Sequence, residues 1–163
     1  MQHLHELLEP FKTVTLGTIS NNGYPFSSYA PFYYDEEVVY IFISNIATHA
    51  QNIQARPKAS AFFIEDESIT DNMFRRKRIS LQCDVSMIPR EHPTFETIMQ
   101  AFIEKQGSTL NMLMGMADFN LYALTPMYGE ATFGFGEAYN IGGDKMNQLI
   151  PRGSTNSHEN AKK

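Results

Sequence analysis

The sequence predicts a mainly β protein of the α+β class, built as an antiparallel barrel with peripheral helices. Strand-like segments follow one another in hairpin-like succession, without the regular strand and helix alternation of a parallel sheet. Asn21-Asn22-Gly23 separates two such segments, and Asn and Gly tolerate the positive φ of tight turns. Pattern counting gives about seven strands and three or four helices.

The first part of the chain predicts one helix followed by three strands. Residues 1–10 place leucines at helical spacing and end at a proline, which predicts a short helix. Residues 11–20 alternate as a strand, and residues 24–34 contain two prolines, which indicates an edge strand or one broken by bulges. Residues 38–43 are continuously apolar and predict a strand buried on both faces.

A short helix is expected next, with Ser44 or Asn45 as its cap and Ile46, Ala50 and Ile53 on its buried stripe. The remaining elements are predicted strands over residues 59–64, 79–87, 119–124 and 131–141, and helices that begin near Pro93 and Ser108.

The pattern predicts one barrel domain over residues 1–142, including the helix over residues 1–10, and a flexible tail over residues 143–163. After Ile150 the tail has no apolar residue except one alanine, so it cannot form a core of its own. It carries His158. A frayed terminus and a tether that brings a histidine to a ligand both remain open at this point.

Composition limits the class of protein. A chain of 163 residues with 42% hydrophobic residues fits one globular domain, and a net charge of −5 argues against a nucleic-acid partner. No apolar run approaches the ~20 residues that span a bilayer. Cys83 is the single cysteine and lies on the apolar face of its strand, so we expect a core residue in a reducing compartment. We therefore expect a cytoplasmic protein without a membrane partner.

Three groups of residues are candidates for a binding site. The run Arg75, Arg76, Lys77 and Arg78 fits either a solvated strand entry or a site for a phosphate or propionate. His49, with Ser44, fits a phosphate contact at a helix start, and a partly buried neighbour of the helix stripe is the alternative. A third group is Gly134-Phe135-Gly136, where a strand face without side chains would admit a flat cofactor; a tight barrel corner is the favoured alternative.

Several stretches together resemble heme-utilisation proteins of the HugZ/HutZ type, a branch of the pyridoxamine 5'-phosphate oxidase-like, FMN-binding split-barrel superfamily. They occur in the family's order between about residues 11 and 142. They are residues 13–18, 28–32, 44–49 with Asn52 and Pro57, 64–66, 78–83, 118–119 with 121–122, and 134–136 with 138–139.

The resemblance implies a homodimer of split barrels with ligand clefts between the subunits, filled by heme in this branch and by FMN in flavin-binding relatives. His158 matches the tail histidine that binds the heme iron. Asp118 matches an aspartate that orients this histidine across the dimer, and Thr13 matches an interface position near the heme. Basic residues 75–78 would neutralise heme propionates or a flavin phosphate.

The leading hypothesis is a heme-binding protein that degrades heme oxidatively and releases iron, using O₂ and an external electron donor. An FMN-dependent oxidoreductase of the pyridoxamine-phosphate-oxidase type is one alternative. A non-enzymatic heme carrier or storage protein is another. The sequence leaves open which of these holds, and whether the tail acts on its own subunit or on the partner.

Overall fold

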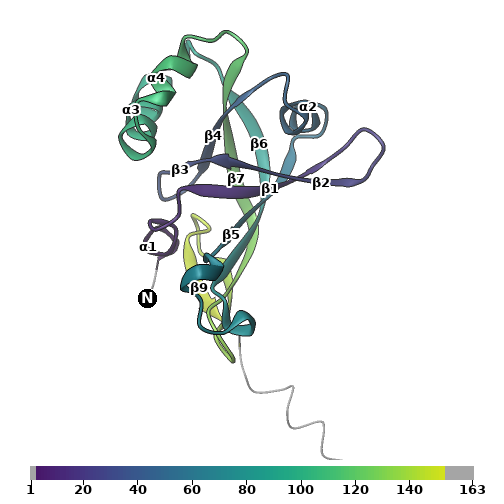
Figure 1. The fold of residues 1–163 in the computed structure, drawn as a ribbon, viewed down its shortest axis with the longest axis vertical. Coiled ribbons are helices and arrows are strands. Elements are labelled where there is room, and N and C mark those ends of the chain that lie inside the picture. Colours follow the sequence, from purple (N-terminus) through teal and green to yellow (C-terminus); the bar gives the residue numbers. More distant parts are fainter. Residues whose placement is uncertain (1–2, 153–163) are drawn as a thin grey trace, which may run out of the picture.

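The computed structural model describes residues 3–152, which form a strongly curved antiparallel sheet with helices at its periphery (Figure 1). The sheet order is β2-β1-β5-β6-β7-β4-β3, and β8 joins β7 to β9. Its strands are β1 Thr13–Ile19, β2 Pro25–Pro31, β3 Tyr33–Tyr34, β4 Val39–Ser44, β5 Lys58–Ile64, β6 Arg78–Ile88, β7 Phe119–Thr132, β8 Ala138–Gly142 and β9 Gln148–Pro151. The helices are α1 Leu4–Leu8, α2 Thr48–Ala55, α3 Phe95–Gln106 and α4 Thr109–Met114, with short 3-10 turns η1 Glu67–Ile69 and η2 Met73–Arg75.

The predicted hairpin and edge strand are both present. β1 and β2 pair from Thr13 opposite Pro31 to Ile19 opposite Pro25, and Gly23 turns the chain at φ +84°. β2 is at one end of the sheet path, where a proline that lacks an N–H costs no ladder hydrogen bond on the open side.

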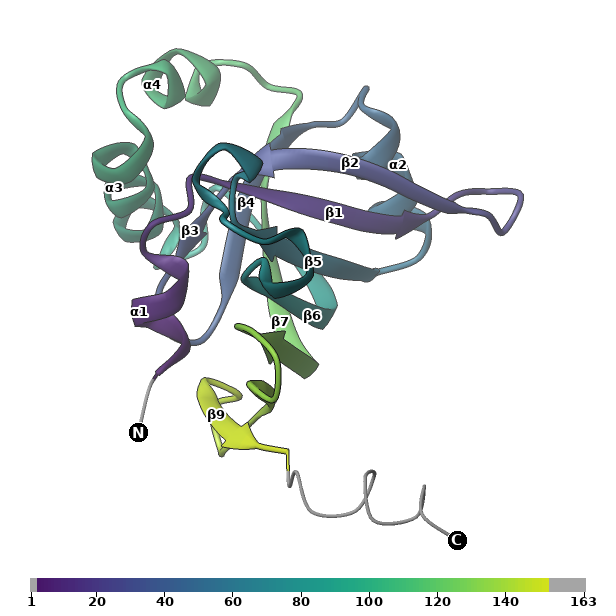
Figure 2. The same cartoon turned by 60° about the horizontal axis from the view of Figure 1, so that its bottom comes forward.

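β4 is buried on both faces, as its apolar run predicts, because it separates two hydrophobic clusters. Ile41 and Ile43 belong to the cluster inside the curved sheet. Tyr40 and Phe42 belong to the outer cluster, which α3 and α4 cover. Both helices lie on one side of the sheet, as Figure 2 also shows.

The helix after β4 begins later than predicted. α2 starts at Thr48 after Ala47, whose side chain provides no cap. Ser44 ends β4 instead of capping the helix, and Ile46 is 81% exposed in the connecting loop. Ala50 and Ile53 are buried as predicted. Ile46 is not part of the buried stripe because it lies in the loop between the end of β4 and the start of α2.

The last two predicted strands are arranged differently from the expectation. β7 is a single strand that continues through Pro126 and Gly129 to Thr132. Gln82 pairs with Tyr128 and Cys83 with Pro126, so a bulge accommodates the proline. Residues 133–137 then form a turn before β8, with Gly136 at φ +74°. The glycine-rich segment is therefore a corner and not a continuous strand face.

Ordered structure extends past residue 142, the predicted end of the barrel domain. β9 pairs with β8 from Gly142 opposite Gln148 to Tyr139 opposite Pro151. Leu149 is buried in the inner cluster and Met146 packs against it, so this segment does have apolar anchors. His158 lies outside the described residues. Within residues 3–152, no helix is both long and apolar enough to cross a membrane.

Cys83 is confirmed as a core residue. Its side chain is buried in the inner cluster, and burial, with a smaller contribution from Asp84, raises the pKa of the thiol to about 12. A buried thiol with a raised pKa is expected to stay protonated at neutral pH, as is typical of structural cysteines.

Candidate functional site

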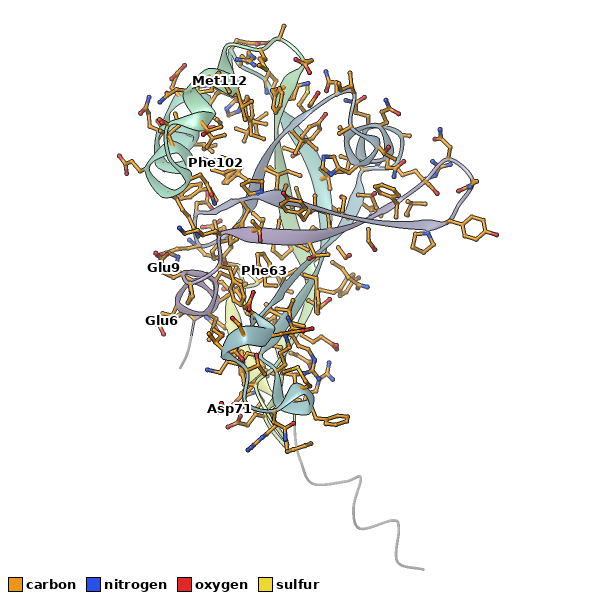
Figure 3. The ribbon with its side chains drawn as sticks, viewed as in Figure 1. Glu6, Glu9, Phe63, Asp71, Phe102 and Met112 are labelled. Atoms are coloured by element: carbon orange, nitrogen blue, oxygen red, sulfur yellow. The ribbon has the colours of Figure 1, made fainter. Side chains whose placement is uncertain are left out.

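A cavity of about 350 Å³ lies between the α3–α4 pair and the strands β2 and β4. Its volume is at the low end of ligand pockets, which are typically about 300–1,000 Å³. The side chains around it are mainly aromatic and aliphatic. They are Tyr29, Ala30, Pro31, Phe42, Ile43, Ser44, His49, Phe102, Gln106, Thr109, Leu110, Leu113 and Phe119. Figure 3 shows Phe102 on the helical side of this region.

His49 contributes a polar edge to the cavity from the first turn of α2. Its Nδ1 lies 2.8 Å from Ser28 Oγ on β2. Partial burial lowers the pKa of His49 below its ordinary value of 6.5, because desolvation disfavours the charged ring. The imidazole is therefore mostly neutral at pH 7.

A buried hydrogen bond fixes the helix that carries His49. Asn52 Nδ2, one turn further along α2, donates to Thr18 Oγ1 on β1 at 3.0 Å. Both side chains are buried, with 4% and 2% of their surfaces exposed. The bond ties α2 to β1 and so limits how far His49 can move relative to β2.

Ser44 and Asp118 meet at the end of β4 although 74 positions separate them in sequence. Ser44 Oγ donates to Asp118 Oδ2 at 2.5 Å, and the Asn45 N–H donates to the Asp118 carbonyl at 2.7 Å. Thr13, at the start of β1, pairs with Pro31, which lines the cavity. Ser44 and His49 therefore line one cavity and Asp118 bonds to Ser44, while Thr13 is linked to this cavity only through its pairing with Pro31.

The basic cluster is elsewhere, in the connection from β5 to β6. Arg75 is exposed, and its guanidinium carbon lies 5.9 Å from the centre of the Phe135 ring. Arg76 donates to the Glu65 carbonyl at 2.5 Å and pairs with Glu67 at 3.3 Å. Arg78 donates to the carbonyl of Arg76 at 2.8 Å. Arg76 thus holds the loop together, while Arg75 and Lys77 are exposed and line the same hollow.

These two groups of residues lie at opposite ends of β7. Ser44 pairs with Phe119 at the start of the strand, and Arg78 pairs with Thr132 at its end. At about 3.3 Å a residue, this length of strand spans roughly 40 Å. Figure 3 shows Phe102, beside the cavity, in the upper part of the molecule and Asp71, in the basic loop, near the bottom. A single chain does not bring the two groups together.

Comparisons with known proteins identify the family. The family model of pyridoxamine 5'-phosphate oxidase matches residues 1–133. Heme oxygenase HutZ of Vibrio cholerae is 34% identical over 147 residues, which cover 90% of this chain and 84% of HutZ. The chain belongs to the HugZ/HutZ-type branch of the pyridoxamine 5'-phosphate oxidase-like split-barrel superfamily.

Structures of HugZ/HutZ-type proteins have the same fold. The crystal structure of Campylobacter jejuni ChuZ matches with a TM-score of 0.81 and 31% identity over 92% of this chain; the chain spans 61% of ChuZ. The structure of V. cholerae HutZ, described as a heme storage protein, matches with a TM-score of 0.73 and 31% identity, covering 82% of this chain and 99% of that one. The split-barrel prediction is confirmed.

Sequence reasoning missed the contribution of α3 and α4 to the cavity. Helical spacing correctly places Phe102 on a buried face, but it cannot show that Gln106 and Leu113 reach the rim. That placement depends on how the helix pair crosses β4, and no local pattern encodes it.

Proposed function

We propose that this HugZ/HutZ-type chain binds heme in a cleft that includes the cavity beside Asp118, and that it degrades the heme with O₂ and an external reductant. The observation that carries the proposal is the placement of Asp118. Its carboxylate accepts a hydrogen bond from Ser44, which lines an apolar cavity, in a chain 34% identical to a heme oxygenase.

The residues present fit a heme. Flat apolar walls, such as Phe42, Phe102 and Leu113, suit the faces of a macrocycle, and an exposed guanidinium such as Arg75 suits a propionate. The cavity in one chain is small for a porphyrin and open on one side. A second copy of the chain would supply the missing wall.

Chain length favours a tail that acts on the partner subunit. The described chain ends near Arg152, whose N–H bonds to the Ala138 carbonyl at the far end of β7 from Asp118. The six residues from Arg152 to His158 reach at most about 20 Å. This is about half the length of β7, so His158 would pair more readily with Asp118 of the partner subunit than with Asp118 of its own chain.

One open face of the sheet suits contact with a second copy. Ile19, Met127 and Tyr128, which is 69% exposed, border a hollow of about 480 Å³ on β1, β5, β6 and β7. Small residues such as Gly17 and Ser60 also line this hollow, together with the ion pair of Lys58 and Asp84. Exposed aromatic and aliphatic side chains with a few polar groups beside them are typical of protein interfaces.

Each residue has a defined task under this proposal. His158 would bind the iron through one imidazole nitrogen. The partner subunit's Asp118 would accept a hydrogen bond from the other ring N–H and so fix the tautomer. Neutral His49 would present a polar edge without adding charge to the cleft. Heme, as substrate, supplies the redox-active iron, and the apolar walls limit the access of water.

Hemin titration of the wild type and of His158→Ala, followed by visible absorption, tests the proposal. We expect one heme per chain in the wild type and a shifted or weakened Soret band in the variant. His92→Ala is the matched control, because His92 is exposed before α3 and its ring bonds to Thr94. Identical spectra for wild type and His158→Ala would contradict the proposed iron ligand.

Turnover separates degradation from storage, the role named for the V. cholerae HutZ structure. With ascorbate and O₂, degradation predicts loss of the Soret band and release of iron to a ferrous chelator. Storage predicts a stable heme spectrum under the same conditions. Tight FMN binding together with weak hemin binding would instead support a flavin-dependent oxidoreductase.

A further inference from the structure

The Ser44 hydroxyl has two hydrogen-bond partners, and together they fix the direction of its proton. Ser44 Oγ accepts a long bond from the Ile46 N–H at 3.4 Å and donates to Asp118 Oδ2 at 2.5 Å. A hydroxyl has one proton, and an N–H group can only donate. The proton therefore points at the carboxylate.

The backbone around Asp118 is also fixed, which leaves its side-chain torsions as the remaining freedom. Its carbonyl accepts the Asn45 N–H at 2.7 Å, and the next residue, Phe119, pairs with Ser44 in the sheet. The hydrogen bond from Ser44 holds those torsions. Among the described residues, the other carboxylate oxygen, Oδ1, accepts no side-chain or backbone hydrogen bond.

The loop that carries Ser44 is itself braced. Asn45 Oδ1 accepts hydrogen bonds from Gln54 Nε2 on α2 at 3.0 Å and from Asn120 Nδ2 on β7 at 2.7 Å. Gln54 also contacts the hydroxyl of Tyr122 at 2.9 Å. These contacts tie the loop to β7 and α2, so the Ser44 hydroxyl is a rigid support and not a mobile surface group.

We propose that Ser44 is a positioning residue: it holds the Asp118 carboxylate in one rotamer, with Oδ1 free to accept the N–H of the iron-binding imidazole. This inference rests on the proposed function. The sequence predicts a direct contact between Ser44 and a cofactor. Under this proposal Ser44 acts through Asp118 instead. Loss of the hydroxyl would leave the carboxylate present but no longer held.

The test compares Ser44→Ala, Asp118→Ala and the double variant as heme-loaded proteins. The first readout is the iron–histidine stretching frequency of the ferrous protein, measured by resonance Raman. The second is the rate of heme transfer to apomyoglobin. We expect Ser44→Ala to lower the frequency toward that of Asp118→Ala and to speed heme loss, within the roughly 10-fold to 100-fold range seen when outer-shell partners of metal ligands are removed.

Two further variants separate positioning from a general structural effect. Ser44→Thr keeps the hydroxyl and should retain the wild-type frequency. Ser86→Ala removes an exposed hydroxyl on β6, opposite Ala123, and should also match the wild type. If Ser44→Ala does not fold, Ser44→Cys keeps the size of the side chain with a much weaker donor, and it takes its place.

The double variant shows whether the effect of Ser44→Ala requires Asp118. In the Asp118→Ala background, adding Ser44→Ala should change neither readout. A full additional effect in that background, or a wild-type frequency in Ser44→Ala alongside a shifted one in Asp118→Ala, would overturn the inference and leave heme binding intact. A wild-type protein that does not bind hemin would overturn the proposed function and this inference together.

Discussion

The neutral imidazole of His49 makes stability depend on pH. Its pKa in the folded protein lies below the ordinary 6.5 because the ring is partly buried. Below pH 6.5 the unfolded chain therefore binds the proton more readily than the folded protein does. The contribution of His49 to stability is complete above this pH and declines as the pH falls through it.

Comparison of the wild type with His49→Gln checks this dependence. We expect the wild type to lose more unfolding free energy than the variant between about pH 7.5 and about pH 5.5, because the other histidines are common to both. Urea unfolding at the two pH values gives the difference. Equal losses in both proteins would show that His49 does not titrate differently on folding.

The hydrogen bond between Asn52 and Thr18 is a second residue-scale feature with a measurable effect. Asn52→Ala would leave the buried Thr18 hydroxyl without its partner and should cost about 1–3 kcal/mol. Gln51→Ala, at the exposed neighbouring position of α2, should stay within about 0.5 kcal/mol of the wild type. Chemical denaturation measures both values, and comparable losses would rule out a special role for the buried pair.

At the scale of elements, local patterns predict most of the fold. The apolar run of β4, the alternation of β6 and the glycine of the first turn each specify their element through short-range chemistry. The errors occur where distant contacts decide the structure. Pro126 resembles a strand breaker, but the bulge opposite Gln82 and Cys83 accommodates it.

The residues of the candidate site could also be predicted from the sequence, whereas the contacts between distant residues could not. The resemblance to the HugZ/HutZ branch pointed to Asp118 and Ser44 separately, yet their contact spans 74 positions and no spacing rule reveals it. The sequence left open whether Arg76 binds an anion or lies at a solvated strand entry, and in the structure it donates to a carbonyl within its own loop. Charge along the sequence shows where a basic group is, and only the fold shows whether its donors are already engaged.

Gly129 offers a test of how tightly β7 packs. A Cβ at this position would lie 2.7 Å from Leu81 Cδ2 and 2.9 Å from Ile141 Cγ1. We expect Gly129→Ala to destabilise the protein by about 1–3 kcal/mol, because β6 and β8 would have to move apart. Ser86→Thr adds one methyl group at an exposed strand position and serves as the control. A stability loss no larger than the control's would show that the neighbours relax freely.

At the scale of the whole molecule, the separation of the two groups along β7 predicts complementation between subunits. A homodimer of His158→Ala, or of Asp118→Ala, has a defect in both clefts. If His158 works with Asp118 of the partner subunit, the mixed dimer contains one intact cleft. Random mixing should then restore about a quarter of the wild-type clefts.

Co-expression of the two variants with different tags, followed by hemin titration of the doubly purified dimer, tests this restoration; without the homodimers, half of the clefts should be intact. Intact sites in the mixed dimer, with a wild-type Soret band, are the expected result. If each tail served its own chain, every cleft in the mixed dimer would carry one defect, and no wild-type signal would appear.

β7 also constrains how this lineage can change in length. Extra residues at the tip of the β1–β2 hairpin would disturb little beyond the loop. One residue gained or lost within residues 119–132 would turn every later side chain of the strand to the opposite face. It would also shift the basic end of the sheet against the end that holds Asp118. Insertions and deletions among related proteins should therefore occur at the hairpin tip and not within this strand, so that the length of β7 stays constant in the family.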